Sequence, residues 1–177
     1  MHKLRDSPGD SEEDLRRRIE DLAGDSLVYV LGLGNTDRAD DGAGILVALA
    51  LKKRFPSFSY SEHDGVEGTV LDISERDEDA TVLFVDAADM KLEPGSVKFI
   101  SKDEIKETEI TTHRVAVALM ASILERSGKR AAVIGIQPGT IEFRGRVSKP
   151  VRTSVQKVAE VLLEPMMRND HRNGCRT

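Results

Sequence analysis

Residues 27–44, LVYVLGLGNTDRADDGAG, place a continuous apolar run before a glycine-rich turn, and that turn before two adjacent acids. An unbroken apolar run of this length is typical of a strand that is covered on both faces. Glycine-rich turns after such strands usually bind phosphate. This turn carries Asp37, Asp40 and Asp41 with Arg38 as its only basic residue, so it predicts a buried strand followed by a loop that does not suit an anion.

The rest of the chain repeats this alternation between apolar runs and helical patterns. Further apolar runs lie at 80–85, 96–100 and 131–136, with a weaker, more polar run at 58–63 that suits an edge strand. Helical periodicity is present at 42–54, 67–76, 113–127 and 148–164. Alternating strands and helices predict an α/β three-layer sandwich with a mostly parallel central sheet. The run at 96–100 follows the turn LEPGS and is expected to be an antiparallel hairpin partner.

The two ends of the chain differ from this central part. Residues 1–25 are a charged N-terminal extension, in which 11–23 are expected to form an amphipathic helix with Ser11 as its cap and only a narrow apolar stripe. Residues 26–164 are then expected to form a single α/β domain. Residues 165–177 are polar, and we expect them to be a disordered C-terminal tail.

Composition argues against several classes of protein. The net charge of −5 over 177 residues does not favour nucleic acid as a partner. No apolar run reaches the about 18 residues that span a bilayer, and the N-terminus is too charged for a secretory signal. Cys175 is the only cysteine, so no disulfide framework is expected, and a flexible tail would not preorganise it with His171 as a metal site. We expect a cytoplasmic protein without a membrane partner.

The residues with candidate chemistry follow the predicted strands. In an open α/β sheet, ligands bind beyond the carboxyl ends of the strands. The residues found there are Gly32, Gly34, Asn35, Asp40 and Asp41, then Asp64 and Gly65, Asp86 and Asp89, His113, and finally Gln137 and Pro138. Carboxylates gathered without basic partners repel one another, which costs stability unless a cation is bound. This edge of the sheet therefore predicts a cation site.

Each of these residues also has a structural explanation. Either Asp40 or Asp41 can cap the helix that follows them, although both cannot. Asp86 can anchor a turn at the end of its strand, and His113 can be an incidental member of a threonine-rich helix cap. These explanations account for the residues one at a time, but not for carboxylates collecting along one edge.

Dinucleotide binding is an alternative function for the same turn. Gly32 and Gly34 follow a strand as in a GxGxxG motif, and Glu62 or Asp64 could bind a ribose. The third glycine position holds Asp37, where only a small residue allows the helix to pack closely. The two acids that follow would face a pyrophosphate, so we regard this alternative as the weaker one.

The motifs taken together resemble the nickel–iron hydrogenase maturation endopeptidases. They are GLGN at 32–35, DDGAG at 40–44, DG at 64–65, VDAADM at 85–90, TTH at 111–113 and GIQP at 135–138. They are most similar to the subgroup that processes the large subunit of hydrogenase 3, and the resemblance covers about residues 27–163. It implies a phosphorylase/hydrolase-like α/β fold. Peptidyl-tRNA hydrolases share the GLGN opening, but their following Pro-Gly turn is absent here, and the net charge of −5 does not suit RNA.

The resemblance implies an endopeptidase that removes the C-terminal extension of a nickel–iron hydrogenase large-subunit precursor after nickel insertion. By position, Asp41, Asp86 and His113 match the family's metal-contacting residues, and they are the expected metal ligands and catalytic residues. The nickel would be supplied by the precursor, and zinc or cadmium could replace it in crystals. Gly32 and Gly34 are expected to let the precursor's tail pass close to the backbone. The other expected substrate-binding or supporting residues are Asn35, Asp40, Asp64, Gly65, Gln137 and Pro138.

The mechanism stays open at this stage. The sequence suggests no Ser-His-Asp or Cys-His pairing and contains no HExxH motif. The metal could polarise the scissile carbonyl or activate a water, or it could only position the tail while Asp41 or Asp86 acts as general base. A scaffold that senses nickel in the precursor without cutting it would need the same three residues. The enzyme is expected to act as a monomer.

Overall fold

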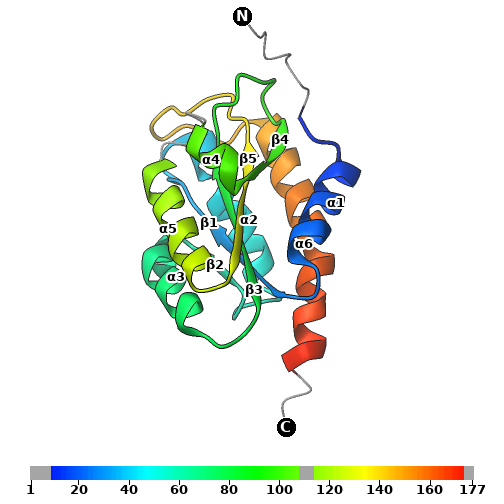
Figure 1. Ribbon diagram of the computed structural model, residues 1–177. Helices are drawn as coiled ribbons and strands as arrows, with labels where there is room; N and C mark the ends of the chain where they lie inside the picture. Colours follow the sequence, from blue (N-terminus) through cyan, green and yellow to red (C-terminus); the bar gives the residue numbers. More distant parts are fainter. Residues whose placement is uncertain (1–8, 108–113, 174–177) are drawn as a thin grey trace, which may run out of the picture.

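The computed structural model describes residues 9–107 and 114–173, and its centre is a five-stranded sheet in the order β2-β1-β3-β5-β4 (Figure 1). The strands are β1 (Leu27–Gly32), β2 (Ser59–Ser61), β3 (Ala80–Ala87), β4 (Val97–Ser101) and β5 (Arg130–Ile136). β1, β2, β3 and β5 are parallel, and β4 is antiparallel to β5. The mostly parallel sheet, the antiparallel direction of the strand near residue 100 and the short edge strand near residue 60 are confirmed. The predicted hairpin is wrong, because β4 pairs with β5 and not with β3, the strand that precedes the turn LEPGS.

Helices cover both faces of this sheet. They are α1 (Glu12–Ala23), α2 (Ala43–Lys52), α3 (Val66–Glu75), α4 (Lys102–Glu107), α5 (Arg114–Arg126) and α6 (Lys149–Asn173), with short 3₁₀ turns η1 (Ala39–Gly42) and η2 (Glu62–Asp64). α1, α2 and α6 pack together on one face, and α3, α4 and α5 on the other (Figure 1). The predicted three-layer sandwich is therefore confirmed, while α4 was not anticipated from the sequence. No helix within the described ranges is long and apolar enough to cross a membrane.

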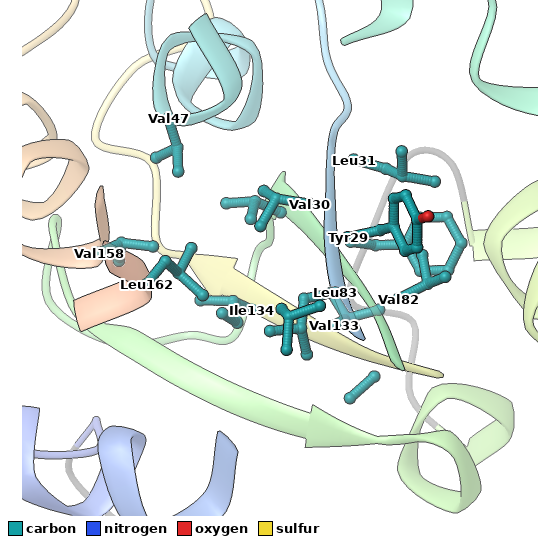
Figure 2. Close-up of a cluster of buried hydrophobic side chains, with 14 of the residues drawn as sticks. Tyr29, Val30, Leu31, Val47, Val82, Leu83, Val133, Ile134, Val158 and Leu162 are labelled. Atoms are coloured by element: carbon teal, nitrogen blue, oxygen red, sulfur yellow. The ribbon is translucent and has the colours of Figure 1, made fainter. Parts of the chain in front are cut away.

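The core explains why the strands are apolar without alternation. Every residue of β1 and of β3 is buried, because helices lie on both sides of the sheet. Figure 2 shows Val30 pointing toward Val47 of α2 and the α6 side chains, while Tyr29 and Leu31 point to the opposite side of β1. Successive residues of one strand thus fill two separate hydrophobic layers.

The predicted N-terminal helix is present, and it belongs to the main core. The Ser11 hydroxyl accepts a hydrogen bond from the backbone N–H of Asp14, as expected of its cap. Leu15 and Ile19 are buried, and α1 packs against α6. Just before the helix, Asp10 accepts a hydrogen bond from the Phe99 N–H, which covers part of the free edge of β4. Residue 25 is thus not a boundary between an extension and a domain.

The expectation of a disordered tail from residue 165 is wrong as far as the structure describes it, because α6 continues through Pro165 to Asn173. Met166 and Asn169 are fully buried. The Asn169 side chain accepts a hydrogen bond from the N–H of Val28 (3.0 Å) and donates one to its carbonyl (2.8 Å). β2 pairs with β1 only from Val30 onward, so this amide takes the place of a strand partner at Val28. Residues 174–177, with Cys175, lie outside the described part.

Candidate functional site

The strand order creates a crevice at the carboxyl edge of the sheet. The chain leaves β1 toward β2 on one side, while β3 leads on to β4 and β5 on the other. Loops diverge at such a switch point, and ligands of open α/β sheets bind there. The β1–β3 ladder is extended beyond β1 by the Leu33 N–H, which donates to the Val85 carbonyl at 2.8 Å. The switch point between β1 and β3 is the part of the fold where a site is expected.

Two of the three predicted metal-contacting residues lie at this switch point. Asp41 belongs to η1, which follows β1 and contacts β3, and the residue is only 9% exposed. Asp86 is the penultimate residue of β3 and is fully buried. His113 lies outside the described residues. The structure therefore brings the two acids to one edge, and the contribution of the histidine stays a prediction.

The loop that carries Asp41 is folded back on itself by its own backbone. The Asn35 N–H donates to the Asp41 carbonyl (3.2 Å), and the Asp41 N–H donates to the Arg38 carbonyl (3.0 Å). Gly34 has a φ of +125°, and a Cβ there would lie 1.9 Å from the Asp41 carbonyl oxygen. The Asn35 side chain accepts a hydrogen bond from the Asp37 N–H (2.8 Å), which closes the first part of the loop.

The glycines of the site have a packing role within the chain itself. A Cβ on Gly32 would lie 2.2 Å from the Gly44 carbonyl oxygen, and a Cβ on Gly44 would lie 2.0 Å from the Val85 carbonyl oxygen. These two glycines let α2 pack directly onto β1 and β3. This packing accounts for Gly32 without a precursor, and the passage of a precursor's tail beside Gly32 and Gly34 stays a prediction.

Asp40 has a structural partner that sequence analysis could not identify. It is fully buried, and its carboxylate accepts hydrogen bonds from the N–H groups of Gly139 (2.8 Å), Thr140 (3.0 Å) and Ser148 (2.6 Å) and from the Ser148 hydroxyl (2.8 Å). The N-cap of α2 is Gly42, which has no side-chain capping bond. The cap hypothesis is therefore wrong for this helix, and Asp40 instead fixes the loop between β5 and α6.

The Asp41 carboxylate differs from that of Asp40 in its hydrogen bonding. Within the ranges that the structure describes, no N–H or O–H group donates a hydrogen bond to the Asp41 carboxylate, although the residue is largely buried. Two adjacent acids thus have different environments. The carboxylate of Asp40 is fully occupied by the protein, and that of Asp41 is left to interact with something else.

Gln137 plays a similar supporting role on the other side of the edge. Its side-chain carbonyl accepts hydrogen bonds from the N–H groups of Met90 (2.7 Å) and Leu92 (3.2 Å), and its amide donates to the Asp89 carboxylate (3.4 Å) and to the Pro138 carbonyl (3.2 Å). The residue is buried. Gln137 therefore holds the loop that follows β3, the strand that carries Asp86.

Asp64 and Gly65 have local structural roles. Asp64 accepts hydrogen bonds from the Ser61 N–H (2.8 Å) and hydroxyl (3.1 Å) and forms an ion pair with Lys52. The Lys52 ammonium group, together with the Ser61 donors, holds the pKa of the Asp64 carboxyl below its usual value. Gly65 adopts a left-handed φ of +78° before α3. Asp64 is thus already paired with a cation of the protein.

The described residues do not complete a metal site by themselves. Within 9–107 and 114–173, no group of three or more His, Cys, Asp or Glu side chains is arranged to hold a metal ion. Asp41 and Asp86 supply two carboxylates to the edge, and any further ligand has to come from outside these ranges or from a bound molecule. The predicted three-residue ligand set is not tested by this structure.

Comparison with known proteins points to one family. Residues 67–165 match the family model described as hydrogenase maturation protease. The chain is 31% identical over 136 residues to the hydrogenase 3 maturation protease of Escherichia coli K12, covering 75% of this chain and 86% of that protein. It is also 31% identical over 144 residues to a putative hydrogenase maturation protease of Methanocaldococcus jannaschii, covering 77% and 94% of the two chains.

Solved structures agree with these sequence matches. The crystal structure of a [NiFe] hydrogenase maturation protease, HycI, from Thermococcus kodakarensis KOD1 superposes with a TM-score of 0.70 at 26% identity, covering 85% of this chain and 99% of that one. The solution structure of the endopeptidase HycI from Escherichia coli gives a TM-score of 0.62 at 26% identity, covering 76% and 87%.

Proposed function

The chain belongs to the hydrogenase maturation proteases, and we propose that it removes the C-terminal extension from the precursor of a nickel–iron hydrogenase large subunit once nickel has been inserted. Family membership makes the chain an endopeptidase, so its chemistry is hydrolysis of a peptide bond. It also favours proteolysis over the two alternatives considered from the sequence, a non-cleaving scaffold and a dinucleotide-binding enzyme, because the relatives are named as proteases.

The observation that carries the nickel part of the proposal is the contrast between Asp40 and Asp41. The Asp41 residue is only 9% exposed, yet its carboxylate accepts no hydrogen bond from the described residues, whereas the carboxylate of its neighbour accepts four. A carboxylate without protein donors is available to a bound cation. Asp86 lies at the same switch point between β1 and β3. A cation presented by a substrate at this edge would meet both acids.

The donor set fits a metal that arrives with the substrate. Two carboxylates, with His113 as the proposed third ligand, leave coordination positions open on a metal such as nickel. The precursor's own ligands would fill the remaining positions, so the ion would be held only in the complex. Recognition of nickel in this way would restrict cutting to precursors that have received their metal.

Hydrolysis then needs a base and an activated carbonyl. Water attacks the scissile carbonyl carbon, its proton passes to a base, and the C–N bond breaks with protonation of the leaving amine. We propose Asp41 or Asp86 as that base, because these are the acids at the switch point. The substrate's nickel would polarise the carbonyl or orient the tail.

The proposal is tested by cleavage of nickel-loaded and nickel-free precursor, followed as a mobility shift. The wild-type enzyme should shorten only the loaded form. The Asp41→Asn variant should leave it uncut while melting close to the wild-type temperature, since the substitution removes no hydrogen bond to the side chain from the described residues. Asp37→Asn, in an exposed residue of the same loop, is the matched control and should cut normally. Normal cutting by Asp41→Asn, or equal cutting of both precursor forms by the wild type, would contradict the proposal.

A further inference from the structure

The loop between β5 and α6 exposes large apolar side chains beside the candidate site. Phe143 is 69% exposed and Ile141 is 47% exposed. The guanidinium carbon of Arg144 lies 5.3 Å from the centre of the Phe143 ring, so the two side chains form one apolar and cationic tip. In Figure 1 this yellow-to-orange loop lies at the same end of the molecule as the green loop that follows β3. Exposed aromatic groups near a site often mark a surface that binds another protein.

The loop is fixed to the segment that carries Asp41. The Asp40 carboxylate binds it at both ends, through Gly139 and Thr140 at the start and Ser148 at the finish. Between these anchors, the Arg144 N–H donates to the Asp37 carbonyl at 2.6 Å. The tip is thus held in position before anything binds, which lowers the entropic cost of binding. A partner seated on the tip would lie next to Asp41.

Backbone strain at Arg144 also indicates that this tip is a binding surface. Arg144 has a φ of +58°, in the left-handed region that costs a side-chain-bearing residue free energy. The following residue, Gly145, closes a turn by donating its N–H to the Glu142 carbonyl at 3.0 Å. A simple connection would place a glycine at the strained position. Here that position carries an arginine side chain beside the exposed Phe143.

This surface is basic although the chain as a whole is acidic. The chain has a net charge of −5, yet the stretch 141–152 carries four basic residues, Arg144, Arg146, Lys149 and Arg152, against the single acid Glu142. The partner that fits is a protein surface with an apolar centre and carboxylates at its margin. The surface adjoins the candidate acids, so a second copy of this chain bound there would block the site, whereas the substrate has to lie over it.

We propose that Ile141, Phe143, Arg144 and Arg146 form a docking tip for the folded body of the large-subunit precursor, separate from the residues that act on its tail. This inference rests on the proposed function, since it takes the precursor as the partner. The docking tip binds the precursor through its apolar pair and its arginines, and thereby places the tail across Asp41 and Asp86. It contributes to affinity and not to the chemical step.

The test compares KM and kcat for nickel-loaded precursor, and Kd for the same precursor measured by biolayer interferometry. Phe143→Ser and the double variant Arg144→Glu/Arg146→Glu should each raise KM and Kd about tenfold or more and leave kcat within about twofold of the wild type. Phe143→Leu should restore most of the affinity. Leu71→Ser, which changes a 50% exposed apolar residue on α3, is the matched control and should alter neither constant.

The outcomes separate the docking tip from the proposed function. Wild-type enzyme that cuts the precursor, with Phe143→Ser showing an unchanged KM and Kd, would overturn the docking tip alone. Wild-type enzyme that binds but cuts no precursor would overturn the proposed function, and the Kd comparison would still decide on the docking tip. A wild-type dimer that Phe143→Ser converts to a monomer, without any change in Kd for the precursor, would identify a second copy as the partner and overturn the inference.

Discussion

Replacing Asn169 tests whether the C-terminal half of α6 is part of the folded core. The side chain makes two buried hydrogen bonds to one residue, Val28, and α6 reaches Asn169 only after Pro165. The Asn169→Leu variant keeps the number and branching of the side-chain heavy atoms, although its methyl groups are bulkier, and the N–H and the carbonyl of Val28 lose their partner. Leaving buried backbone groups unsatisfied costs about 1–3 kcal/mol for each group, so for these two groups we expect a loss of about 2–6 kcal/mol in the free energy of unfolding.

That loss is large compared with the total stability of a domain, which is about 5–15 kcal/mol. For a chain of this length it corresponds to a fall in Tm of roughly 4–24 °C. Urea unfolding followed by circular dichroism gives the free energy directly, and the slope of the transition should stay constant if only stability changes. Arg168→Ala is the neighbouring control, because it removes only exposed ion pairs with Glu20 and Glu164, which are worth less than about 1 kcal/mol.

Asn169→Asp adds a second test through pH. The carboxyl group can accept a hydrogen bond from the Val28 N–H, and in its protonated form it can also donate to the Val28 carbonyl. Burial disfavours the charged form, so its pKa in the folded state is raised above that in the unfolded state. Stability is then retained at low pH and lost as pH rises through the folded-state pKa. If Asn169→Leu loses no more stability than Arg168→Ala, or Asn169→Asp shows no pH dependence beyond that of the wild type, the role of this amide is refuted.

Three further predictions concern the site and its surroundings. Asp40→Ala should lower the free energy of unfolding by about 2–4 kcal/mol, more than the loss of an ordinary helix cap, because four hydrogen bonds to the loop 139–148 lose their acceptor. It should lower the rate of cleavage only in part, and urea unfolding and the cleavage assay measure the two effects. Lys52→Met should lower the free energy of unfolding by less than about 1 kcal/mol at neutral pH. The pKa of the Asp64 carboxyl is lowered in the folded state, so the difference in stability between variant and wild type should disappear as the pH falls below 3.8, the ordinary pKa of an aspartate. Urea unfolding at several pH values measures this difference. Chelator-treated enzyme should still cut nickel-loaded precursor, and elemental analysis should find less than one metal per purified chain, whereas stoichiometric zinc that is required for cutting would contradict a metal carried by the substrate.

The sequence predicts those parts of the fold that local pattern determines. Runs such as 80–85 and 131–136 are apolar throughout because both faces of the sheet are covered, and such runs are easily found. The end of α6 is not predicted, because it lacks such a continuous apolar run. A helix against one face needs only a few buried residues, and Met166 and Asn169 stand among charged neighbours after a proline. Polar composition alone therefore suggested a tail.

For the site, the sequence predicts which edge of the sheet carries it, but not which role each residue has there. Asp40 and Asp41 are adjacent and chemically identical, so no local pattern separates them. What separates them is a set of donors about a hundred residues further along the chain, at Gly139, Thr140 and Ser148. The packing of the glycines is likewise not visible in the sequence. A glycine after a strand indicates close approach of some group, and only the fold shows that this group is the backbone of α2 at Gly32 and the Asp41 carbonyl of η1 at Gly34.

Buried side chains bind the backbone of the loops around Asp41 and Asp86, and this affects how the two acids can bind a cation. Loops beyond the ends of strands have no ladder to satisfy their backbone groups, so those groups need other partners. Here two buried side chains supply them: Asp40 binds the loop 139–148 and Gln137 binds the loop after β3. Each of these side chains joins segments that carry or adjoin Asp41 and Asp86. Both acids are therefore held by rigid neighbours before any substrate arrives, and a rigid pair of carboxylates accepts a cation only at a set position. The recognition of nickel that we propose needs that property, because a flexible pair would adapt to an unloaded precursor as well.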